Sequence, residues 1–522
     1  MKGRCLPMPI DRIRIVFSRF FILAVALITT VIVVGCAVGP DFRKPDAPPV
    51  SRYTAEPLPA RTASADIKGG AAQAFIEGMD IPAQWWTLFH SKALNELIER
   101  AIRANPDLEA AQAALRVARE NLYAQRGAFF PGVSGSFTPT RQNVGNTLSS
   151  VLASDDTIYS LHTAQVSVAY TVDVFGGLRR QVESAKAQAD AQHFQLEAAY
   201  LTLTSNVVAA AVQEAGLRGQ IAATKRIIEI QTRSLELLRQ QYTLGQIAEM
   251  DVVAQEAALA QTQTTLPPLE KQLAQQRDLL ARLAGGYPSE ALAEQFELAS
   301  LELPEELPLS LPSLLVAQRP DIRAAEELLH SASADIGVAV ANRLPNITLA
   351  ADTGSAATTF GDLFSSGTGF WALAGNLTQP IFQGGTLLHR QRAAEAAFKQ
   401  ASALYRAAVL AAFQNVADTL QAVRCDADGL KAAVAAEKAA ARSLAIAHTQ
   451  LELGDVSYLA LLNAEQTYQQ AVLTKVQNLA NRYADTAALF QALGGGWWNR
   501  ADLADGTEDR LIKSENAQLE KK

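Results

Sequence analysis

The sequence contains little cysteine and little histidine. Its 522 residues include three cysteines (Cys5, Cys36 and Cys425) and six histidines. Three cysteines so far apart do not form a disulfide framework or a zinc site, and the histidines show no metal-ligand spacing. A Gly-rich phosphate loop, a His-Glu-x-x-His motif and a Ser/His/Asp motif are also missing. The sequence therefore predicts no metal, no cofactor and no enzyme activity.

An excess of positive charge is missing as well. Lys and Arg number 46 and Asp and Glu number 53, so the formal net charge is −7. Nucleic-acid-binding domains usually carry a basic surface, so this balance argues against nucleic acid as a partner. The apolar fraction of 49% is that of a folded protein. The length allows two or three ordinary domains or one elongated domain.

The uncharged run at residues 20–35 is too short for an ordinary membrane span. It has 16 residues, whereas a spanning helix needs about 20. Basic residues precede it, which is typical of a targeting segment. The sequence VVG before Cys36 resembles a bacterial lipobox, in which the cysteine becomes the first mature residue and carries lipid. We therefore predict a lipoprotein signal peptide at residues 1–35 and lipidation of Cys36; the alternative is an uncleaved anchor helix. Ala37 resembles the second residue of lipoproteins sorted to the outer membrane.

What the sequence does contain is an internal repeat with a nearly constant offset. Five landmarks recur 207 to 214 residues later: NPDLEAA at 105–111 and RPDIRAA at 319–325, Pro131 and Pro345, DVFGGLRRQ at 173–181 and PIFQGGTLLHRQ at 380–391, YTLGQIAEMDVVAQEAAL at 242–259 and LELGDVSYLALLNAEQTY at 451–468, and LAGG at 283–286 and LGGG at 493–496. Chance similarity would not hold this register over five landmarks. We predict two structural copies, 93–300 and 313–496, joined by a linker at 301–312.

Each copy is expected to contain a helix, two strands, a very long helix and a return helix, in that order. Residues 165–174 alternate between apolar and polar with a period of two, which is the pattern of a strand with two different faces. The predicted strands lie at about 132–141 and 165–174 in the first copy and about 346–353 and 370–380 in the second. Loops are expected at 142–162 and 354–369.

The long helices are predicted at 177–243 and 386–452. Each range has 67 residues without proline, and the second contains 22 alanines; alanine is the strongest helix former. At 1.5 Å per residue each helix would be about 100 Å long. Return helices are expected at 249–284 and 458–493, with a kink or break at Pro267-Pro268.

Strands of about ten residues with one apolar face match the strands of membrane barrels. Backbone groups in lipid must all be hydrogen-bonded, so such a barrel has to close. Four strands cannot close it, because the smallest such barrels have eight. Three copies would supply twelve strands. An ordinary soluble sheet is the alternative, but it leaves helices of about 100 Å unexplained.

Six motifs follow one another along the chain: CAVGPDF at 36–42, WWTLF at 85–89, LNELIERAIRANPDLEAA at 94–111, LPSLLVAQRPDIRAAE at 311–326, PIFQGG at 380–385 and ALGGGWW at 492–498. Taken in this order, they resemble the TolC-like outer-membrane factor family. The resemblance is closer to its lipoprotein branch (the NodT/OprM-like group), which serves resistance–nodulation–division (RND) efflux pumps.

The resemblance implies a mixed α/β membrane protein. It implies a homotrimer whose twelve-stranded transmembrane β-barrel lies in the outer membrane and continues into a long twelve-helix periplasmic α-barrel. It also implies a lipidated, extended segment at 36–92. The C-terminal tail at 497–522 is expected to be equatorial or, where it is charged and without periodicity, disordered. Trp497 and Trp498 are expected to pack in the equatorial zone, with an aromatic belt at the membrane interface as the alternative. The implied partners are a periplasmic membrane-fusion adaptor, an inner-membrane RND transporter and outer-membrane lipid.

Two helix–helix turns, at 244–252 and 453–461, would form the far end of the tunnel. Gly245 and Gly454 are expected to end the long helices in the left-handed conformation, and the resemblance implies that the adaptor docks there. Glu249, Asp251 and Asp455 lie close by. Three copies would place these acids in rings at a narrow mouth, which could select cations and gate the duct. Glu249 and Asp251 also suit the first turn of a helix, where acids favour the helix dipole.

The predicted function is a passive exit duct of an RND-type tripartite pump for small molecules such as drugs or toxic compounds. A channel for type I protein secretion is the nearest alternative, but the Cys36 lipobox and the WWTLF segment favour the drug-type pump. A periplasmic coiled-coil scaffold with an uncleaved anchor is an alternative from another class.

Overall fold

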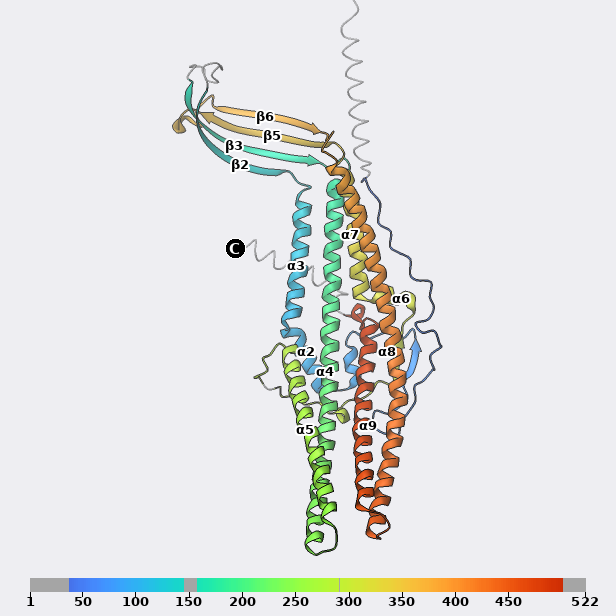
Figure 1. Cartoon of the computed structure of the whole chain (residues 1–522). Helices are drawn as coiled ribbons and strands as arrows, with labels where there is room; N and C mark the ends of the chain where they lie inside the picture. Colours follow the sequence, from blue (N-terminus) through green and yellow to red (C-terminus); the bar gives the residue numbers. More distant parts are fainter. Residues whose placement is uncertain (1–36, 145–156, 291, 501–522) are drawn as a thin grey trace, which may run out of the picture. The chain divides into compact units, whose positions relative to one another are not determined.

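The structure is a computed structural model that describes residues 37–144, 157–290 and 292–500 (Figure 1). The chain divides into two units. The first, here the sheet unit, comprises Met1–Lys44, Arg116–Asp190 and Glu326–Ala403. The second, here the hairpin unit, comprises Pro45–Leu115, Ala191–Ala325 and Leu404–Lys522. The predicted signal peptide, Cys36 and most of the predicted tail lie outside the described residues.

The sheet unit contains one four-stranded antiparallel sheet in the order β2-β3-β5-β6. Its strands are β2 (Gly132–Asn143), β3 (Ile158–Val172), β5 (Asn346–Ala357) and β6 (Gly369–Thr378). One row of paired residues crosses the whole sheet through Gly132, Ala169, Ala350 and Ala374. Within the described chain, β2 and β6 are edge strands, and each pairs on one side only.

Three of the four strands, β2, β3 and β5, are longer than the alternating pattern predicted, whereas β6 ends two residues before its predicted end. The ends of the expected loop at 142–162 are strand, because β2 runs to Asn143, which pairs with Ile158 at the start of β3; residues 145–156 lie outside the described residues. Likewise β5 continues to Ala357, and its Ser355 pairs with Gly369. Hydrogen bonds to a neighbouring strand extend a ladder into polar sequence that shows no alternation of its own.

Six helices carry the fold, in three pairs of equal length. They are α3 (Pro106–Gly127) and α7 (Pro320–Ala341) with 22 residues, α4 (Gly177–Thr243) and α8 (Thr386–Glu452) with 67, and α5 (Glu249–Leu283) and α9 (Tyr458–Ala492) with 35. At 1.5 Å per residue, α4 and α8 are about 100 Å long. The side chain of Asn105 starts α3 by accepting hydrogen bonds from the backbone N–H of Asp107 (2.9 Å) and Leu108 (3.2 Å).

The predicted break at Pro267-Pro268 is absent, since α5 continues through both prolines. Both side chains are exposed. Water can therefore solvate the carbonyl groups that lose their helical N–H partners to proline. The hydroxyl groups of Thr264 and Thr265 also donate to helix carbonyls one turn back, at 2.7 Å each.

The predicted linker at 301–312 contains a strand that the sequence did not signal. In the hairpin unit, β4 (Glu306–Leu309) pairs in parallel with β1 (Ala74–Glu77). Two shorter helices flank these segments, α2 (Lys92–Ala104) and α6 (Pro312–Gln318). The fully buried guanidinium group of Arg482 fixes the chain before β1, as it donates to the carbonyl of Ala71 at 2.6 Å.

An aromatic cluster forms the centre of the hairpin unit. Trp85 stacks on Phe490 of α9 with ring centroids 5.4 Å apart, and both side chains are buried. Trp497 donates from Nε1 to the carbonyl of Gln318 at 2.6 Å, and Trp498 donates to Asp80 at 3.0 Å. The WWTLF segment and the terminal tryptophans are therefore packing residues of this unit. Among the described residues, no helix has the length and apolar character needed to cross a membrane.

Candidate functional site

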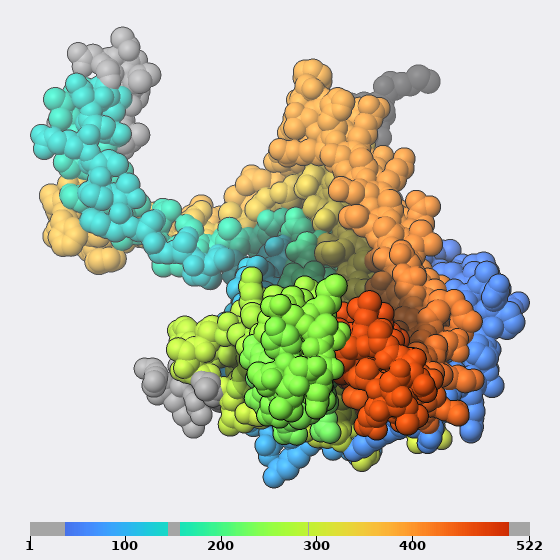
Figure 2. Space-filling model, turned by 60° about the horizontal axis from the view of Figure 1, so that its bottom comes forward, coloured from blue at the N-terminus to red at the C-terminus, as the bar shows by residue number. Residues whose placement is uncertain are grey.

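The candidate site lies at the ends of two helical hairpins in the hairpin unit. The α4–α5 hairpin turns at residues 244–248, and the α8–α9 hairpin turns at 453–457. Figure 2 shows these two ends side by side, the first in green and the second in red. They are called the hairpin tips below.

Gly245 and Gly454 build the two tips in the same way. Their φ angles are +70° and +76°, in the left-handed region that was expected. In each turn the glycine N–H donates to the carbonyl three residues back, at 2.9 and 3.0 Å. The N–H of the next residue, Gln246 or Asp455, donates to the carbonyl five residues back, at 2.9 Å in both. This pair of hydrogen bonds ends a helix sharply and lets the chain reverse its direction.

The three predicted gate acids occupy different positions at the tips. Asp455 follows Gly454 directly and is exposed, so its carboxylate is held beyond the end of α8. Glu249 is the exposed first residue of α5, and the partly buried Asp251 lies in the same first turn. Both α5 acids therefore suit the helix dipole. Asp455 stands at the C-terminal end of a helix, where the dipole gives an acid no stabilisation.

Apolar side chains are exposed at both tips. Leu244 and Leu453, which precede the two turn glycines, are 72% and 71% exposed. Met250 in the first turn of α5 is 77% exposed. The same residue type in the same exposed position at both tips is a feature that a docking partner could bury.

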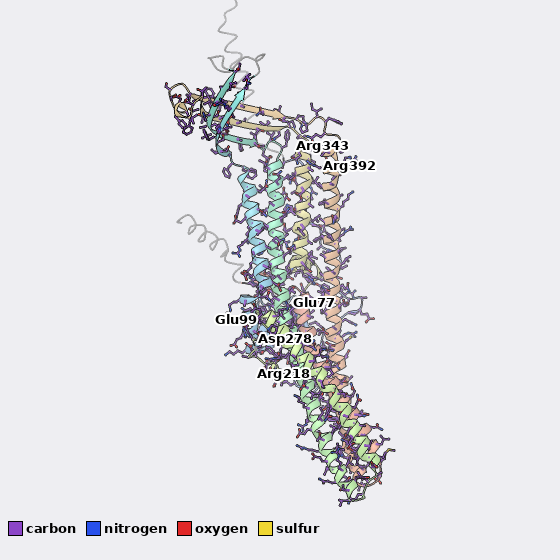
Figure 3. The ribbon with its side chains drawn as sticks, turned by 60° about the vertical axis from the view of Figure 1, so that its left-hand side comes forward. Glu77, Glu99, Arg218, Asp278, Arg343 and Arg392 are labelled. Atoms are coloured by element: carbon purple, nitrogen blue, oxygen red, sulfur yellow. The ribbon has the colours of Figure 1, made fainter. Side chains whose placement is uncertain are left out.

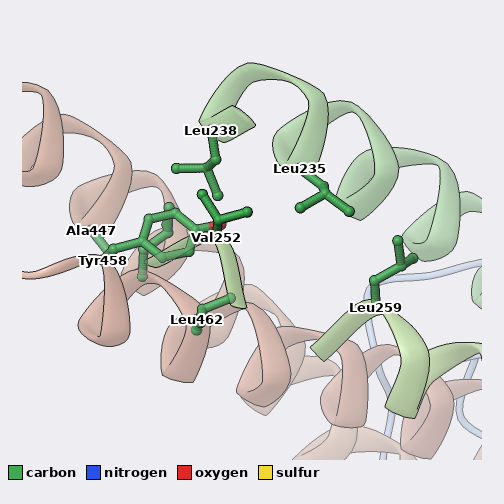
Figure 4. Packing of buried hydrophobic residues seen from close by; sticks show 8 residues of the cluster. Leu235, Leu238, Val252, Leu259, Ala447, Tyr458 and Leu462 are labelled. Atoms are coloured by element: carbon green, nitrogen blue, oxygen red, sulfur yellow. The ribbon is translucent and has the colours of Figure 1, made fainter. Parts of the chain in front are cut away.

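A hydrophobic cluster behind the tips holds the two hairpins together (Figure 4). The cluster consists of Leu235, Leu238, Val252, Leu259, Ala447, Tyr458, Leu461 and Leu462. It draws side chains from α4, α5, α8 and α9, so the tips share one core.

A polar chain crosses this core, and sequence analysis missed it. The hydroxyl of Tyr458 donates to Oε1 of Gln255 at 2.8 Å, and Nε2 of Gln255 donates to the backbone carbonyl of Gln231 at 2.9 Å. The chain thus joins α9, α5 and α4. Burial raises the pKa of Tyr458, and the nearby charges of Glu465 and Asp251 add to the rise. In the sequence, this chain of hydrogen bonds is indicated only by a polar residue at a core position in each of α4, α5 and α9.

Two carboxyl groups of the α8–α9 hairpin, the buried Glu465 and the partly buried Asp426, lie in unusual surroundings. Glu465 is 5% exposed, and neither carboxyl oxygen has a hydrogen-bond partner within the described residues. Burial raises the pKa of Glu465 to about 7. Burial, together with a hydrogen bond to Asp485, raises the pKa of Asp426 to about 7. These carboxyl groups are therefore largely protonated below neutral pH.

In the sheet unit, apolar and basic side chains gather where the sheet meets the helices. Ile381 and Phe382, between β6 and α8, are 95% and 86% exposed. Arg343 and Arg392 lie near this junction (Figure 3). Along β6, Trp371, Leu373 and Leu377 are also largely exposed, so the sheet carries apolar side chains that no part of the described chain covers.

The chain combines very long helical hairpins with an antiparallel sheet that exposes apolar side chains. This is the fold of the outer-membrane channel proteins that it resembles. The family model described as "Outer membrane efflux protein" matches residues 97–286 and 311–495. The chain belongs to this family. The predicted efflux function and outer-membrane location are thereby confirmed.

Curated relatives cover nearly the whole chain. A "Probable efflux pump outer membrane protein TtgC" of Pseudomonas putida is 29% identical over 480 residues, which is 92% of this chain and 96% of the relative. A "Pyoverdine export outer membrane protein OpmQ" of the same species is 30% identical over 84% of this chain and 94% of its own length. A "Probable outer membrane lipoprotein SilC" of Salmonella typhimurium is 28% identical over 92% and 99%.

Solved structures share the fold. The outer-membrane channel OprN is 28% identical with a TM-score of 0.78 and covers 88% of this chain and 100% of its own. The outer membrane protein VceC of Vibrio cholerae is 25% identical with a TM-score of 0.75, covering 80% and 100%. The Campylobacter jejuni CmeC outer membrane channel, at 20% identity and a TM-score of 0.80, shows likeness of fold alone.

Proposed function

We propose that three copies of this chain form one channel, with a twelve-stranded barrel in the outer membrane and a twelve-helix tunnel in the periplasm. The observation that carries the proposal is the open sheet. Its edge strands β2 and β6 are each unpaired on one side within the described chain. The exposed side chains Trp371, Leu373 and Leu377 suit a lipid surface. Pairing β2 of one copy with β6 of the next would satisfy the backbone and close the barrel.

The channel would be the passive exit duct of an RND-type tripartite pump. A periplasmic adaptor would dock on the hairpin tips, where Gly245 and Gly454 fix the turns and Leu244 and Leu453 offer apolar surface. An inner-membrane transporter would supply the energy. The relatives, whose names refer to toluene, antibiotic and pyoverdine export, support a small-molecule cargo for this chain.

The gate would use the acids of the tips. Asp455 is the leading candidate because it is exposed and lies beyond the end of α8, where no helix dipole explains it. Three copies would bring three such carboxylates around one mouth. Lipidation at Cys36 would add a second anchor to the barrel, with Cys36 as the first mature residue.

Membrane fractionation followed by electron microscopy of the detergent-solubilised protein tests this proposal. We expect the protein in the outer-membrane fraction and trimeric particles with a tube of about 100 Å. Monomeric or dimeric particles would exclude the trimeric barrel. Fractionation with the inner membrane would instead favour a periplasmic scaffold with an uncleaved anchor.

A further inference from the structure

The first described residues of the chain pack against the start of α4 and against α7 in the sheet unit, and the surface that they contact is called the groove below. These residues, 37–44, are called the N-terminal strap below. The N–H of Val38 donates to the carbonyl of Phe175, at the turn between β3 and α4, at 3.0 Å. Phe42 stacks on the ring of His330 in α7 with centroids 4.3 Å apart. Lys44 forms an ion pair with Glu326 of α7 at 3.0 Å. The strap therefore touches α4 and α7 at several points.

Arg180 is the centre of this contact. Its guanidinium group lies in the first turn of α4, and the residue is 4% exposed. It donates to the backbone carbonyl of Val38 at 3.2 Å, to Asp41 at 2.7 Å and to Glu183 at 2.7 Å. A guanidinium group presents five donors in a fixed plane, so it can hold a backbone carbonyl and two carboxylates together, which lysine cannot.

The groove is shaped for a close backbone approach. A Cβ atom on Gly337 of α7 would lie 2.7 Å from the carbonyl oxygen of Val38 and 2.8 Å from Cγ of Arg180. Any larger residue at position 337 would therefore push the strap out. Two side-chain hydrogen bonds connect α4 of the first repeat copy with α7 of the second beside the groove. They join Glu183 to His330 at 3.0 Å and Ser184 to Ser331 at 2.9 Å.

We propose that this groove is a docking site for the segment that follows Cys36, with Arg180 as the positioning residue. The docked strap holds Ala37 and Val38 at the turn that follows β3, beside Phe175 and Gly176. If Cys36 is lipidated, as proposed above, its acyl chains enter the membrane next to the sheet of their own chain. The anchor is then part of the folded sheet unit and does not act as a free tether. Because the groove needs α4 and α7 together, the strap docks only after these helices have packed.

Limited proteolysis of the purified protein tests this assignment. Trypsin can cut after Arg43, inside the strap, and mass spectrometry follows the cleavage of the Arg43–Lys44 bond. We expect Arg180→Gln and Gly337→Val to speed this cleavage roughly tenfold, because a protease needs a segment free of its docking contacts. Arg126→Gln is the matched control: Arg126 lies in the last turn of α3 in the same unit, and its guanidinium group lies over the ring of Tyr123, 5.8 Å from the centroid. It should leave the rate unchanged.

A gentler variant covers the case in which these substitutions disturb folding. The side chain of Asp41 is 91% exposed, so Asp41→Asn removes one strap contact of Arg180 without touching the core. We expect cleavage about threefold faster and an unchanged melting temperature, since a surface substitution has little effect on stability. Cleavage at the wild-type rate in both Asp41→Asn and a folded Arg180→Gln protein would overturn the proposal.

A lipid-free chain separates the groove from the anchor. This chain is exported with a non-lipoprotein signal and carries serine at position 36. We expect its Arg43–Lys44 bond to resist trypsin as in the wild type, because the groove holds the strap. Cleavage as fast as in Arg180→Gln would show that the lipid alone holds the strap, and would overturn the proposal. Acyl labelling and the oligomeric state of the wild type are measured in separate experiments. A failure of the proposed lipidation or of the proposed trimer is therefore distinguished from a failure of strap docking.

Discussion

The hydroxyl of Tyr458 and the side-chain amide of Gln255 form a 2.8 Å hydrogen bond that joins the return helices of the two hairpins. Both residues are buried, and Gln255 passes the connection on to the backbone of α4. A buried hydrogen bond of this kind fixes the register of the packed helices, because a shift along the helix axis would leave its polar atoms without partners.

Tyr458→Phe should destabilise the protein. The substitution leaves Oε1 of Gln255 buried without its donor, which costs about 2 kcal/mol. Thermal unfolding of the purified protein measures the change. Tyr242→Phe is the matched control, because Tyr242 lies near the same tip and is 44% exposed. Equal melting temperatures for the two variants would show that this hydrogen bond does not stabilise the protein.

The stability of the α8–α9 hairpin should fall as the pH rises. The pKa of Glu465 goes from 4.5 to about 7 on burial, so between these values the folded state binds more protons than the unfolded state. The free energy of unfolding therefore decreases from about pH 4.5 to pH 7 and then levels off, by up to about 3 kcal/mol. Thermal unfolding at several pH values measures this slope.

Glu465→Gln should flatten that slope and raise the melting temperature at pH 8, because the amide carries no charge to bury. Asp426, whose pKa is also raised to about 7, should leave a smaller slope of the same sign. Glu452→Gln, at an exposed position of α8, is the control and should keep the wild-type slope. A wild-type slope in Glu465→Gln would show that Glu465 is ionised in the folded protein.

Gly454→Ala and Gly245→Ala should each destabilise a tip. A side chain in the left-handed conformation costs about 1 to 2 kcal/mol, and both glycines have φ near +70°. Nothing lies within 4 Å of a Cβ atom at either position, so the loss would come from the backbone alone. Gly127→Ala, where the space is equally open and φ is not positive, should be close to neutral in the same melting experiment.

Leu244→Ser and Leu453→Ser should weaken adaptor binding without lowering the melting temperature. Each side chain is about 70% exposed in the chain, and burying a leucine contributes about 2 kcal/mol, so the Kd should rise by roughly tenfold or more for each variant. Titration calorimetry or surface binding with the purified adaptor measures it. Tyr287→Ser, which removes a 74% exposed side chain away from the tips, should leave the affinity unchanged.

Asp455→Asn should raise the ion conductance of the proposed trimer in planar bilayers. Neutralising three carboxylates at a narrow mouth would release the cations that they bind there and that obstruct the mouth. Glu452→Gln changes an acid one turn earlier on α8 and is the control. If both variants conduct as the wild type does, Asp455 is not part of the gate. Channel formation by these variants would still support the proposed duct.

The sequence by itself determined the helical part of this protein. Runs of 67 residues without proline, bounded by Gly177 and Gly245 or by Thr386 and Gly454, gave α4 and α8 at the expected ranges. The signals that start and end a helix lie within a few residues of the chain, as Asn105 shows at α3 and Gly454 shows at the tip. Such local signals can be recognised without knowing the fold.

Only the tertiary structure decided how distant segments meet. The β1–β4 pair joins Ala74 to Glu306, Arg482 fixes the chain before β1, and the strap reaches α7 through Phe42 and His330. Tyr458 likewise meets a glutamine about 200 residues away in the chain. These partners share no local pattern, because their contacts exist only once the long helices have packed side by side. Backbone propensity sets the lengths of the elements, whereas packing and buried hydrogen bonds set their neighbours.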